Sequence, residues 1–552
     1  IDIISGEAGA DVLIGGEAGD IIYGDNAPAN AGEDGSADEG DIILGDNGDI
    51  FLKGGSGQFE EMGNLEVMAT AVDYIITTDV GEDTGGADTI SGNAGADVIL
   101  GGVNGVDGVD GGPDILYGDA AIQGSNDRDD LILGDNGILL FNYDWRADAT
   151  PDDDDYSDLD GDRTTLDLVR SFTDQLGGID IISGDAGGDM VLGGTGDDVI
   201  YGDNADSHAG TLDLDDILFG DNGDVLLTGI VGERILLGTA VARIMPTDEM
   251  ETTGGADVIE GNAGGDVIVG GVNNGGIDIL HGDAAALDSN DGDDILLGDQ
   301  ALLRWDVTVD EALIEVVPGT LAVGDGDTDD VGDQTTLDLI QTYNTGSQGG
   351  VDHIYGNDGS DVAMGGKAGD EIYGDFYYDG VLHSAGIPGQ DVLLGDGGEI
   401  TFINAKVTVI RTIEPGEGGA DFIRGNDFGD TILGGFAGDE LYGEAMAENL
   451  GLVRSLEDES RAGDDWILGD NGRLDFILAS DDLLGREDVG DSVDLDSNSD
   501  NLDRVMTTDP TLGGDDVIYG NGNSGEGTSD IIFGGTGSDT VRGDTSDTGP
   551  GD

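Results

Sequence analysis

The sequence of 552 residues contains no cysteine, and only 18 of its residues are lysine or arginine. Without cysteine, neither a disulfide framework nor a thiolate metal site can stabilise the fold. No run of about 18 apolar residues occurs, so the sequence predicts neither a membrane-spanning helix nor membrane insertion. The fold must therefore be stabilised by other means, which the abundant residue types indicate.

The sequence contains 121 aspartates and glutamates against these 18 basic residues, which gives a formal net charge of −103. Such a charge repels nucleic acid and anionic membrane surfaces, so both are excluded as partners. With 37% hydrophobic residues, the chain lies close to the disordered class, and a cation should be part of the folded structure. Because thiolates are absent, a metal ligated by oxygen is the class of cation that remains.

Glycine is the second abundant residue type, with 104 copies, and it recurs with aspartate at a fixed interval. In GGADTISGNAGADVILGG (85–102), Asp88 and Asp97 lie nine residues apart, and each is followed by a short apolar run and then by glycine. Neither a helix nor a half-buried strand repeats every nine residues, so each unit must contain one short strand and one turn. A fixed short period of this kind predicts a solenoid.

The units form groups of four turns, which we call modules. The groups begin at Asp2, Asp88, Asp180, Asp257, Asp352, Asp421 and Asp516. This predicts six modules and a truncated seventh, with the boundaries 1–87, 88–179, 180–256, 257–351, 352–420, 421–515 and 516–552.

The fourth turn of a complete module reads like LGDNG, as at 44–48, 133–137 and 468–472. A longer strand-like stretch follows it, such as ILLFN (138–142) or EITFINAKVTVIRT (399–412), and several modules carry a second one. The close match of GDRTTLDLV (161–169) with GDQTTLDLI (332–340) indicates that these connecting segments were duplicated together with the modules. We therefore expect them to belong to the architecture.

Several units resemble the Gly-Gly-x-Gly-x-Asp-x-apolar-x nonapeptides of the RTX, or haemolysin-type calcium-binding, proteins. They are GNAGADVIL (92–100), GDAGGDMVL (184–192), GGTGDDVIY (193–201), GNAGGDVIV (261–269), GNDGSDVAM (356–364) and GGTGSDTVR (534–542). The resemblance implies an all-β parallel β-roll or β-solenoid with two nonapeptides per coil, inserted strands or hairpins, and no helical domain. It also implies multiple calcium ions between successive turns, and secretion by bacteria into an extracellular or cell-surface location.

A glycine turn followed by aspartate offers both backbone carbonyls and a carboxylate, which are hard oxygen ligands that suit calcium. We predict metal ligands mainly at the sixth position of the units, with the second-position Asp185 and Asp203 as supplementary ligands. The other predicted ligands are Asp11, Asp20, Asp97, Asp114, Asp189, Asp198, Asp266, Asp278, Asp361, Asp370, Asp430, Asp439, Asp530 and Asp539.

The alternative for each aspartate is that it caps a turn through a hydrogen bond from the backbone. Four units favour this alternative, because GGEAGD (15–20), GGKAGD (365–370), GNDFGD (425–430) and GGFAGD (434–439) replace the second glycine of the pattern by alanine or phenylalanine. The stretches 152–162, 324–330 and 494–500 are rich in aspartate but lack the glycine and glutamate of an EF-hand loop. The four histidines show no metal-binding spacing and are interpreted as surface residues.

No serine nucleophile or distinct carboxylate pair points to catalysis, so the sequence predicts no enzyme. One hypothesis is a calcium-rigidified rod in a giant adhesin, a surface layer or a surface filament, and the length of the repeat array favours it. The other is a calcium-dependent folding or secretion module attached to a larger RTX enzyme or toxin. An ice- or carbohydrate-binding face is disfavoured, because there is no Thr-x-Thr ladder and there are three tryptophans.

The ninth residue of each unit should point out of the roll, and the eighth should point into it. In turns two and four the ninth residues are all apolar: Ile14, Leu44, Leu100, Leu133, Leu192, Phe219, Val269, Leu297, Met364, Leu394, Leu433, Leu468 and Phe533. Such an apolar strip needs a cover. The candidates are the module's own strand pair, such as 400–412, or neighbouring copies that associate into a filament or sheet.

Overall fold

The computed structural model describes the following residues: 1–7, 9–25, 40–52, 72–79, 85–104, 112–119, 128–141, 166–172, 177–203, 214–227, 235–236, 239–248, 254–273, 275–283, 292–305, 337–343, 349–375, 389–403, 406–444, 463–476, 502–520 and 530–543. These residues contain forty strands and no helix, which confirms the all-β prediction. None of them therefore belongs to a helix that could cross a membrane.

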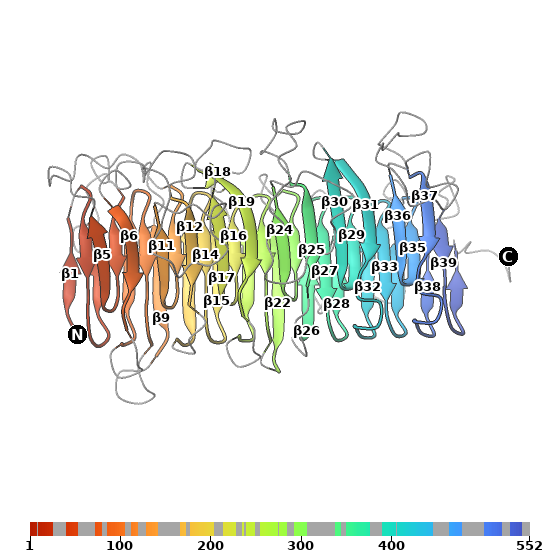
Figure 1. Ribbon diagram of the computed structural model, residues 1–552, viewed down its shortest axis with the longest axis horizontal. Helices are drawn as coiled ribbons and strands as arrows, with labels where there is room; N and C mark the ends of the chain where they lie inside the picture. The colour runs from red at the N-terminus through yellow and green to blue at the C-terminus, as the bar shows by residue number, and fades with distance from the viewer. Residues whose placement is uncertain are drawn as a thin grey trace, which may run out of the picture.

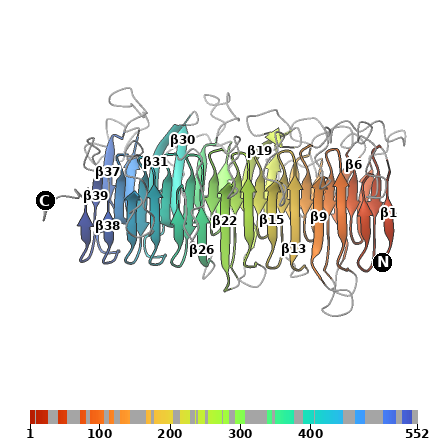
Figure 2. The same cartoon turned by 180° about the vertical axis from the view of Figure 1, so that it is seen from behind.

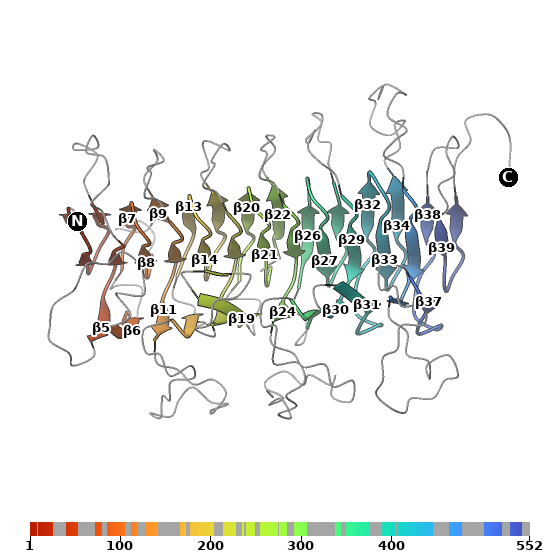
Figure 3. The ribbon, with the colours of Figure 1, turned by 90° about the horizontal axis from the view of Figure 1, so that it is seen from above.

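The strands form three layers that run along the length of the molecule (Figures 1 and 3). Strands from turns one and three of the modules form a 14-stranded parallel sheet, which we call the odd-turn sheet. Strands from turns two and four form a 13-stranded parallel sheet, the even-turn sheet. The connecting segments form a third sheet, the cover sheet, which is antiparallel.

The odd-turn sheet, which faces the viewer in Figure 2, contains β1 (Ile3–Ser5), β3 (Ile21–Tyr23), β7 (Thr89–Asn93), β9 (Asp114–Asp119), β13 (Asp180–Asp185), β15 (Val199–Asp203), β20 (Val258–Asn262), β22 (Ile277–Asp283), β26 (Val351–Tyr355), β28 (Glu371–Tyr373), β32 (Phe422–Asn426), β34 (Glu440–Glu444), β38 (Val517–Tyr519) and β40 (Thr540–Arg542). The even-turn sheet contains β2 (Val12–Ile14), β4 (Ile42–Leu44), β8 (Val98–Leu100), β10 (Leu131–Leu133), β14 (Met190–Leu192), β16 (Ile217–Phe219), β21 (Val267–Val269), β23 (Ile295–Leu297), β27 (Val362–Gly366), β29 (Val392–Asp396), β33 (Thr431–Gly435), β35 (Trp466–Asp470) and β39 (Ile531–Phe533).

The cover sheet takes two neighbouring strands from each complete module. They are β5 (Gly48–Leu52) and β6 (Val72–Thr77), β11 (Gly137–Leu140) and β12 (Leu168–Ser171), β17 (Gly223–Leu227) and β19 (Thr239–Pro246), β24 (Ala301–Arg304) and β25 (Leu339–Thr342), β30 (Gly398–Ile403) and β31 (Lys406–Thr412), and β36 (Gly472–Asp475) and β37 (Arg504–Thr507), with β18 (Ile235–Leu236) paired to β19. The described ends of the duplicated segments, 166–169 and 337–340, lead into β12 and β25, so these parts belong to the architecture.

The core between the two parallel sheets is built from the eighth residue of each unit. Successive side chains of a strand point to opposite faces, so the middle residue of each three-residue strand points inward. Ile99 of β8 and Ile200 of β15 are fully buried there, within a column of isoleucine, leucine and valine that runs through the stack. The order of the strands confirms two turns per coil.

The ninth residues of turns two and four point to the opposite face of the even-turn sheet, as expected. All of them from Leu44 to Leu468 are at most 1% exposed, whereas Ile14 and Phe533, in the two outermost strands of the sheet, are 42% and 38% exposed. They pack against a row of apolar residues that crosses the cover sheet: Ile50, Ile75, Leu139, Val169, Val225, Ile244, Leu303, Ile340, Ile400, Ile410, Leu474 and Val505. The strand pairs of the modules therefore cover the apolar strip.

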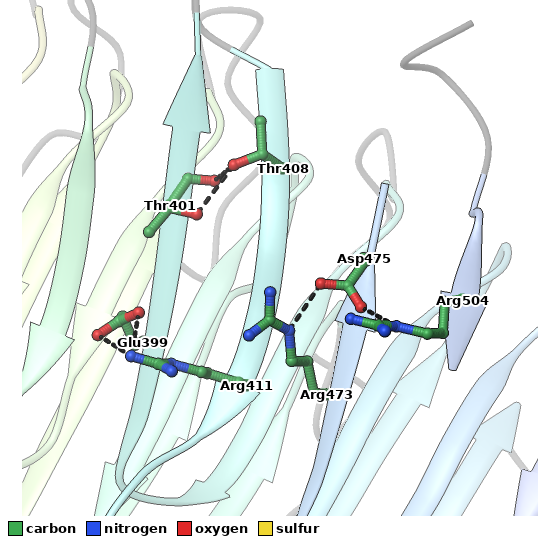
Figure 4. Close-up of polar contacts among 7 residues, drawn as sticks. All are labelled: Glu399, Thr401, Thr408, Arg411, Arg473, Asp475 and Arg504. Atoms are coloured by element: carbon green, nitrogen blue, oxygen red, sulfur yellow. Dashed lines mark hydrogen bonds and ion pairs between the residues drawn. The ribbon is translucent and has the colours of Figure 1, made fainter. Parts of the chain in front are cut away.

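The opposite face of the cover sheet carries arginines that pair with buried carboxylates across neighbouring strands (Figure 4). Arg411 lies 2.8 Å from Glu399, and Asp475 accepts hydrogen bonds from both Arg473 (2.6 Å) and Arg504 (2.7 Å). The Arg411–Glu399 bond joins β31 to β30 and the Arg504–Asp475 bond joins β37 to β36, whereas Arg473 and Asp475 lie on the same strand.

Neighbouring modules are also joined in the cover sheet by hydroxyl groups at the ends of its strands. The Thr77 hydroxyl accepts a hydrogen bond from the Gly137 N–H, and the Thr412 hydroxyl accepts one from the Gly472 N–H, at 2.9 and 3.1 Å. Ser171 and Thr342 make the same bond to Gly223 and Gly398. The sheet is therefore continuous from one module to the next.

The cover sheet predicts where apolar side chains matter for stability. Replacing the fully buried Leu303 by alanine should cost about 2–5 kcal/mol locally, because a cavity would open between the cover and even-turn sheets. Hydrogen exchange should accelerate in β24, β25 and β30. The matched control is Leu214→Ala, whose side chain is 53% exposed and which should change exchange little. Equal effects of the two variants would contradict the packing described above.

Candidate metal sites

Two rows of aspartates run along the stack, one residue per turn, each just before its strand. They are buried except at the two ends of the stack, where Asp2 is exposed and Asp11, Asp530 and Asp539 are half-buried. In each row the backbone N–H of one aspartate donates to Oδ1 of the aspartate one coil further on. Examples are Asp97 to Asp130 and Asp180 to Asp198, both at 2.7 Å. The odd-turn row consists of Asp2, Asp20, Asp88, Asp114, Asp180, Asp198, Asp257, Asp278, Asp352, Asp370, Asp421, Asp439, Asp516 and Asp539. The even-turn row consists of Asp11, Asp41, Asp97, Asp130, Asp189, Asp216, Asp266, Asp294, Asp361, Asp391, Asp430, Asp465 and Asp530.

The second carboxylate oxygen of these residues has a different environment. In many of them Oδ2 is buried and accepts no hydrogen bond from the described part of the chain. This holds for Asp20, Asp88, Asp114, Asp130, Asp180, Asp198, Asp257, Asp278, Asp352, Asp361, Asp370, Asp391, Asp421, Asp430, Asp439 and Asp516. A buried carboxylate oxygen without a donor is costly, so the ionised group needs a cation beside it.

A glycine at the start of each turn leaves room next to this oxygen. A Cβ on Gly184 would lie 2.2 Å from Asp189 Oδ2 and 2.3 Å from the carbonyl oxygen of Gly202, one coil further on. The same arrangement, with an aspartate Oδ2 and a glycine carbonyl oxygen, recurs at 24 glycines. Any side chain at these positions would fill a space lined by oxygen atoms.

The donor set of this space fits calcium, which takes six to eight oxygen ligands from carboxylates and carbonyls in flexible geometry. Among the residues that the structure describes, no three carboxylate or imidazole side chains gather as a metal-binding cluster. The ligands available to each ion are therefore at most two carboxylates, together with backbone carbonyls such as that of Gly202, one coil further on. Such a set can be built only when neighbouring coils are stacked.

Burial raises the pKa of several of these carboxyl groups, because the charged form is poorly solvated inside the roll. The pKa of Asp180 rises to about 7 and that of Asp257 to about 8. In Asp130 and Asp361 neighbouring carboxylates add to the effect of burial, and the pKa lies well above its usual value. The roll thus holds carboxylates that resist ionisation unless a cation is bound.

Fourteen of the sixteen ligands predicted from the sequence belong to the two rows. Asp185 and Asp203 are buried but lie outside the rows. Asp185 Oδ1 accepts a hydrogen bond from the Ser183 hydroxyl at 2.8 Å, and Asp203 Oδ2 accepts one from the Ala263 N–H at 2.9 Å. Their role as supplementary ligands remains a prediction.

The rows also contain aspartates that are absent from the set of predicted ligands. They come from first and fourth turns, whose glycine pattern is incomplete: Asp2, Asp41, Asp88, Asp130, Asp180, Asp216, Asp257, Asp294, Asp352, Asp391, Asp421, Asp465 and Asp516. The Asp-x-apolar-x signal alone would have identified them, because it sets the position of the strand and therefore of the aspartate before it.

The alternative role as turn caps applies to another set of aspartates. Asp129, Asp215 and Asp293 each accept one backbone N–H bond, from Gly188, Gly265 and Ser360 respectively. In the two rows one side chain can serve both as a cap and as a metal ligand. Its Oδ1 accepts a hydrogen bond from a backbone N–H, and its Oδ2 faces the glycine carbonyl.

The four units without the second glycine keep their aspartates in the rows. The residues that replace this glycine, Ala18, Ala368, Phe428 and Ala437, have φ values between 65 and 82°. This left-handed conformation is unfavourable for residues other than glycine. The stacked coils therefore enforce the turn where the local sequence does not favour it.

Other candidates from the sequence do not form metal sites in the described residues. His281 stacks on Tyr355 with ring centroids 4.7 Å apart, and His353 lies 3.7 Å from Glu371, all on the outer face of the odd-turn sheet. His208, His383 and the acidic stretches 152–162, 324–330 and 494–500 lie outside the described residues.

The fold and the turns define a parallel β-roll whose coils are joined by glycine–aspartate turns suited to calcium. A family model described as the RTX calcium-binding nonapeptide repeat matches seven segments, each lying mainly in a different module: 1–26, 77–104, 176–207, 247–277, 348–376, 415–445 and 524–547. Comparison with curated proteins gives no match. The chain is therefore an RTX calcium-binding repeat protein, and calcium ions bind to its repeats.

Substitution of one aspartate of the rows should act locally, because solenoid stability is a sum of local and nearest-neighbour terms. Asp361→Asn retains an acceptor for the Asp294 N–H but removes the charge. We expect this variant to bind fewer calcium ions than the wild type and to lose hydrogen-exchange protection only near residues 351–375. Asp293→Asn, at an exposed cap, is the matched control. An equal loss of calcium in both variants would contradict the assignment of the row aspartates as calcium ligands.

The raised pKa values predict how the calcium-free protein responds to pH. For Asp88, Asp180 and Asp352 the pKa rises from 3.8 in the unfolded chain to about 7 in the roll. This contribution to stability is complete below about pH 3.8 and is lost as the pH rises through about 7. Calcium-stripped protein should therefore show more β-sheet by circular dichroism at pH 5.5 than at pH 8.5. Calcium-loaded protein serves as the control and should change little. More structure at pH 8.5 without calcium would refute the prediction.

Proposed function

We propose that this chain is a calcium-rigidified rod that serves as a structural part of a bacterial cell surface, as in a filament, a surface layer or a giant adhesin. The observation that carries the proposal is the unbroken pairing of 14 strands in the odd-turn sheet and 13 in the even-turn sheet. At the usual strand spacing, the 14 strands span about 62 Å. The proposed location is extracellular, where millimolar calcium is available.

Charge neutralisation explains how the rod becomes rigid. One calcium ion at each of the 27 turns would bring about 54 positive charges, roughly half of the net charge of −103. Each ion would connect a carboxylate to a carbonyl of the next coil. Binding would therefore fix the distance between coils as well as offset their repulsion.

We also propose the division of the chain into six modules and a truncated seventh, with the boundaries given above. Each complete module contributes four strands to the roll and two neighbouring strands to the cover sheet, which supports the division. The alternative, a folding or secretion module of a larger enzyme or toxin, requires no such cover sheet. We assign the repeats no catalytic role.

Self-association into a filament or sheet is part of the proposal. The cover sheet already occupies the apolar face of the even-turn sheet, so copies would not need to exchange strands there. They would have to meet at other surfaces.

The proposal predicts calcium-dependent folding and an elongated shape. In chelator the chain should be expanded and largely without β-structure, and at roughly millimolar calcium it should become β-rich and compact. Circular dichroism measures the β-structure content, and small-angle X-ray scattering measures the length and cross-section of the particle. Magnesium at the same concentration is the control, because it prefers strict octahedral geometry and retains its water ligands. An unchanged spectrum after chelation would refute calcium-dependent folding, and a globular scattering profile with calcium would refute the rod.

A further inference from the structure

A second set of buried aspartates lies between modules. One follows the glycine after the fourth-turn strand of each complete module, in the sequence LGD or, in the third module, FGD. We call them the joint aspartates: Asp46, Asp135, Asp221, Asp299, Asp396 and Asp470. All six are at most 2% exposed.

The joint aspartates accept backbone N–H bonds from the following module at two separate places. The first donor is a glycine just before the first turn. Asp221 Oδ1 accepts from the Gly255 N–H at 2.9 Å, and the same bond reaches Asp135, Asp299, Asp396 and Asp470 from Gly178, Gly350, Gly419 and Gly514.

The second donor lies just after the second-turn strand of the following module. Oδ2 of Asp221 accepts from the Val272 N–H, and Oδ2 of Asp135 accepts from the Thr195 N–H. The equivalent bonds join Asp46 to Val103, Asp299 to Lys367, Asp396 to Phe436 and Asp470 to Thr536. In five of the six residues both carboxylate oxygens therefore accept hydrogen bonds from the backbone.

The glycine before the second donor is shaped for this contact. Gly194 and Gly271 have φ values of 111 and 114°, and a Cβ on them would lie 2.6 and 2.4 Å from Oδ2 of Asp135 and Asp221. The Gly-Gly pair at the end of the second turn thus has two functions. Its first glycine opens the space beside a carboxylate of the rows, and its second allows the joint aspartate to approach the backbone.

We propose that the joint aspartates are positioning residues that fix each module to the next, and that they are not calcium ligands. In Asp135, Asp221, Asp299, Asp396 and Asp470 both oxygens already have N–H donors, which distinguishes them from the aspartates of the rows, whose Oδ2 faces a glycine carbonyl. A joint aspartate connects two segments of the following module to the last turn of the preceding one. It therefore contributes to the interaction free energy between neighbouring modules, on which the stability of a solenoid depends.

The proposal rests on the calcium-binding roll proposed above, so its test must separate calcium binding from module coupling. The full chain carries Asp221→Ala. The matched control is Asp215→Ala, since Asp215 is exposed, lies in the same turn and accepts one N–H, from Gly265 of the same following module. Asp257→Asn, in the odd-turn row, is the calcium-ligand variant.

Two measurements are made on each protein: the number of calcium ions bound at saturation, by equilibrium dialysis with metal analysis, and hydrogen exchange in calcium. We expect Asp221→Ala to bind as many ions as the wild type, while the amides of 254–255 and 270–273 exchange at least about tenfold faster, because the two backbone hydrogen bonds to the carboxyl group are lost. The strands β8 and β10, in an earlier module, should remain as protected as in the wild type.

Loss of calcium in Asp221→Ala but not in Asp215→Ala would show that the joint aspartate is a ligand and overturn the proposal. Exchange no faster than in Asp215→Ala would also overturn it. If Asp257→Asn binds as many ions as the wild type, the ligand assignment of the rows fails, whereas the exchange data still decide the role of Asp221. Should Asp221→Ala not fold, Asp221→Asn keeps one acceptor and should lose protection at only one of the two donor segments.

Discussion

The fold depends on one electrostatic constraint, which is that carboxylates buried at the spacing of β-strands must be neutralised. Unit charges about 4.8 Å apart repel each other by roughly 3 kcal/mol at an effective dielectric constant of 20, and the two rows place a carboxylate in every turn. Four arginines of the cover sheet pair with carboxylates of that sheet itself, which are Asp224, Glu399 and Asp475. Calcium ions at the turns are the charges that allow the coils to stack.

The sequence was sufficient to predict the parts of the fold that follow from a strict period. The nine-residue spacing indicated one strand and one turn per unit, and the apolar ninth residues of even turns indicated a covered face. The complete cover sheet could not be predicted in this way, because its strands follow connecting segments of variable length and composition. Pairing across modules, such as Ile410 with Leu474, is determined by the stacked roll beneath.

The candidate sites were predictable to a similar degree. The glycine pattern identified aspartates of second and third turns, but it could not show that Oδ1 and Oδ2 of one carboxylate have different partners. Nor could it separate Asp135 from Asp189, since both follow glycine in similar units. The difference arises from which backbone N–H groups the neighbouring coil presents, and this depends on contacts 43 to 60 residues away in sequence.

The LGDNG sequence shows how much structure one short motif can specify. In 133–137, Leu133 packs into the core beneath the cover sheet, and Gly134 lies against Asp180 Oδ2. Asp135 accepts a hydrogen bond from the Gly178 N–H, just before the first turn of the next module. Gly137 leaves room for the side chain of Leu133 as the chain enters β11. These four positions meet different steric or hydrogen-bonding requirements, and so the motif marks the place where the chain leaves the roll for the cover sheet.

The insertion of connecting segments between turns has a consequence for the dimensions of the molecule. Module starts are between 69 and 95 residues apart, yet every complete module adds four strands to the roll, which is two coils or about 10 Å. Physical length therefore grows with the number of modules and is independent of the number of residues in each. The number of modules therefore sets the length of the roll, and residues inserted between turns do not change that length.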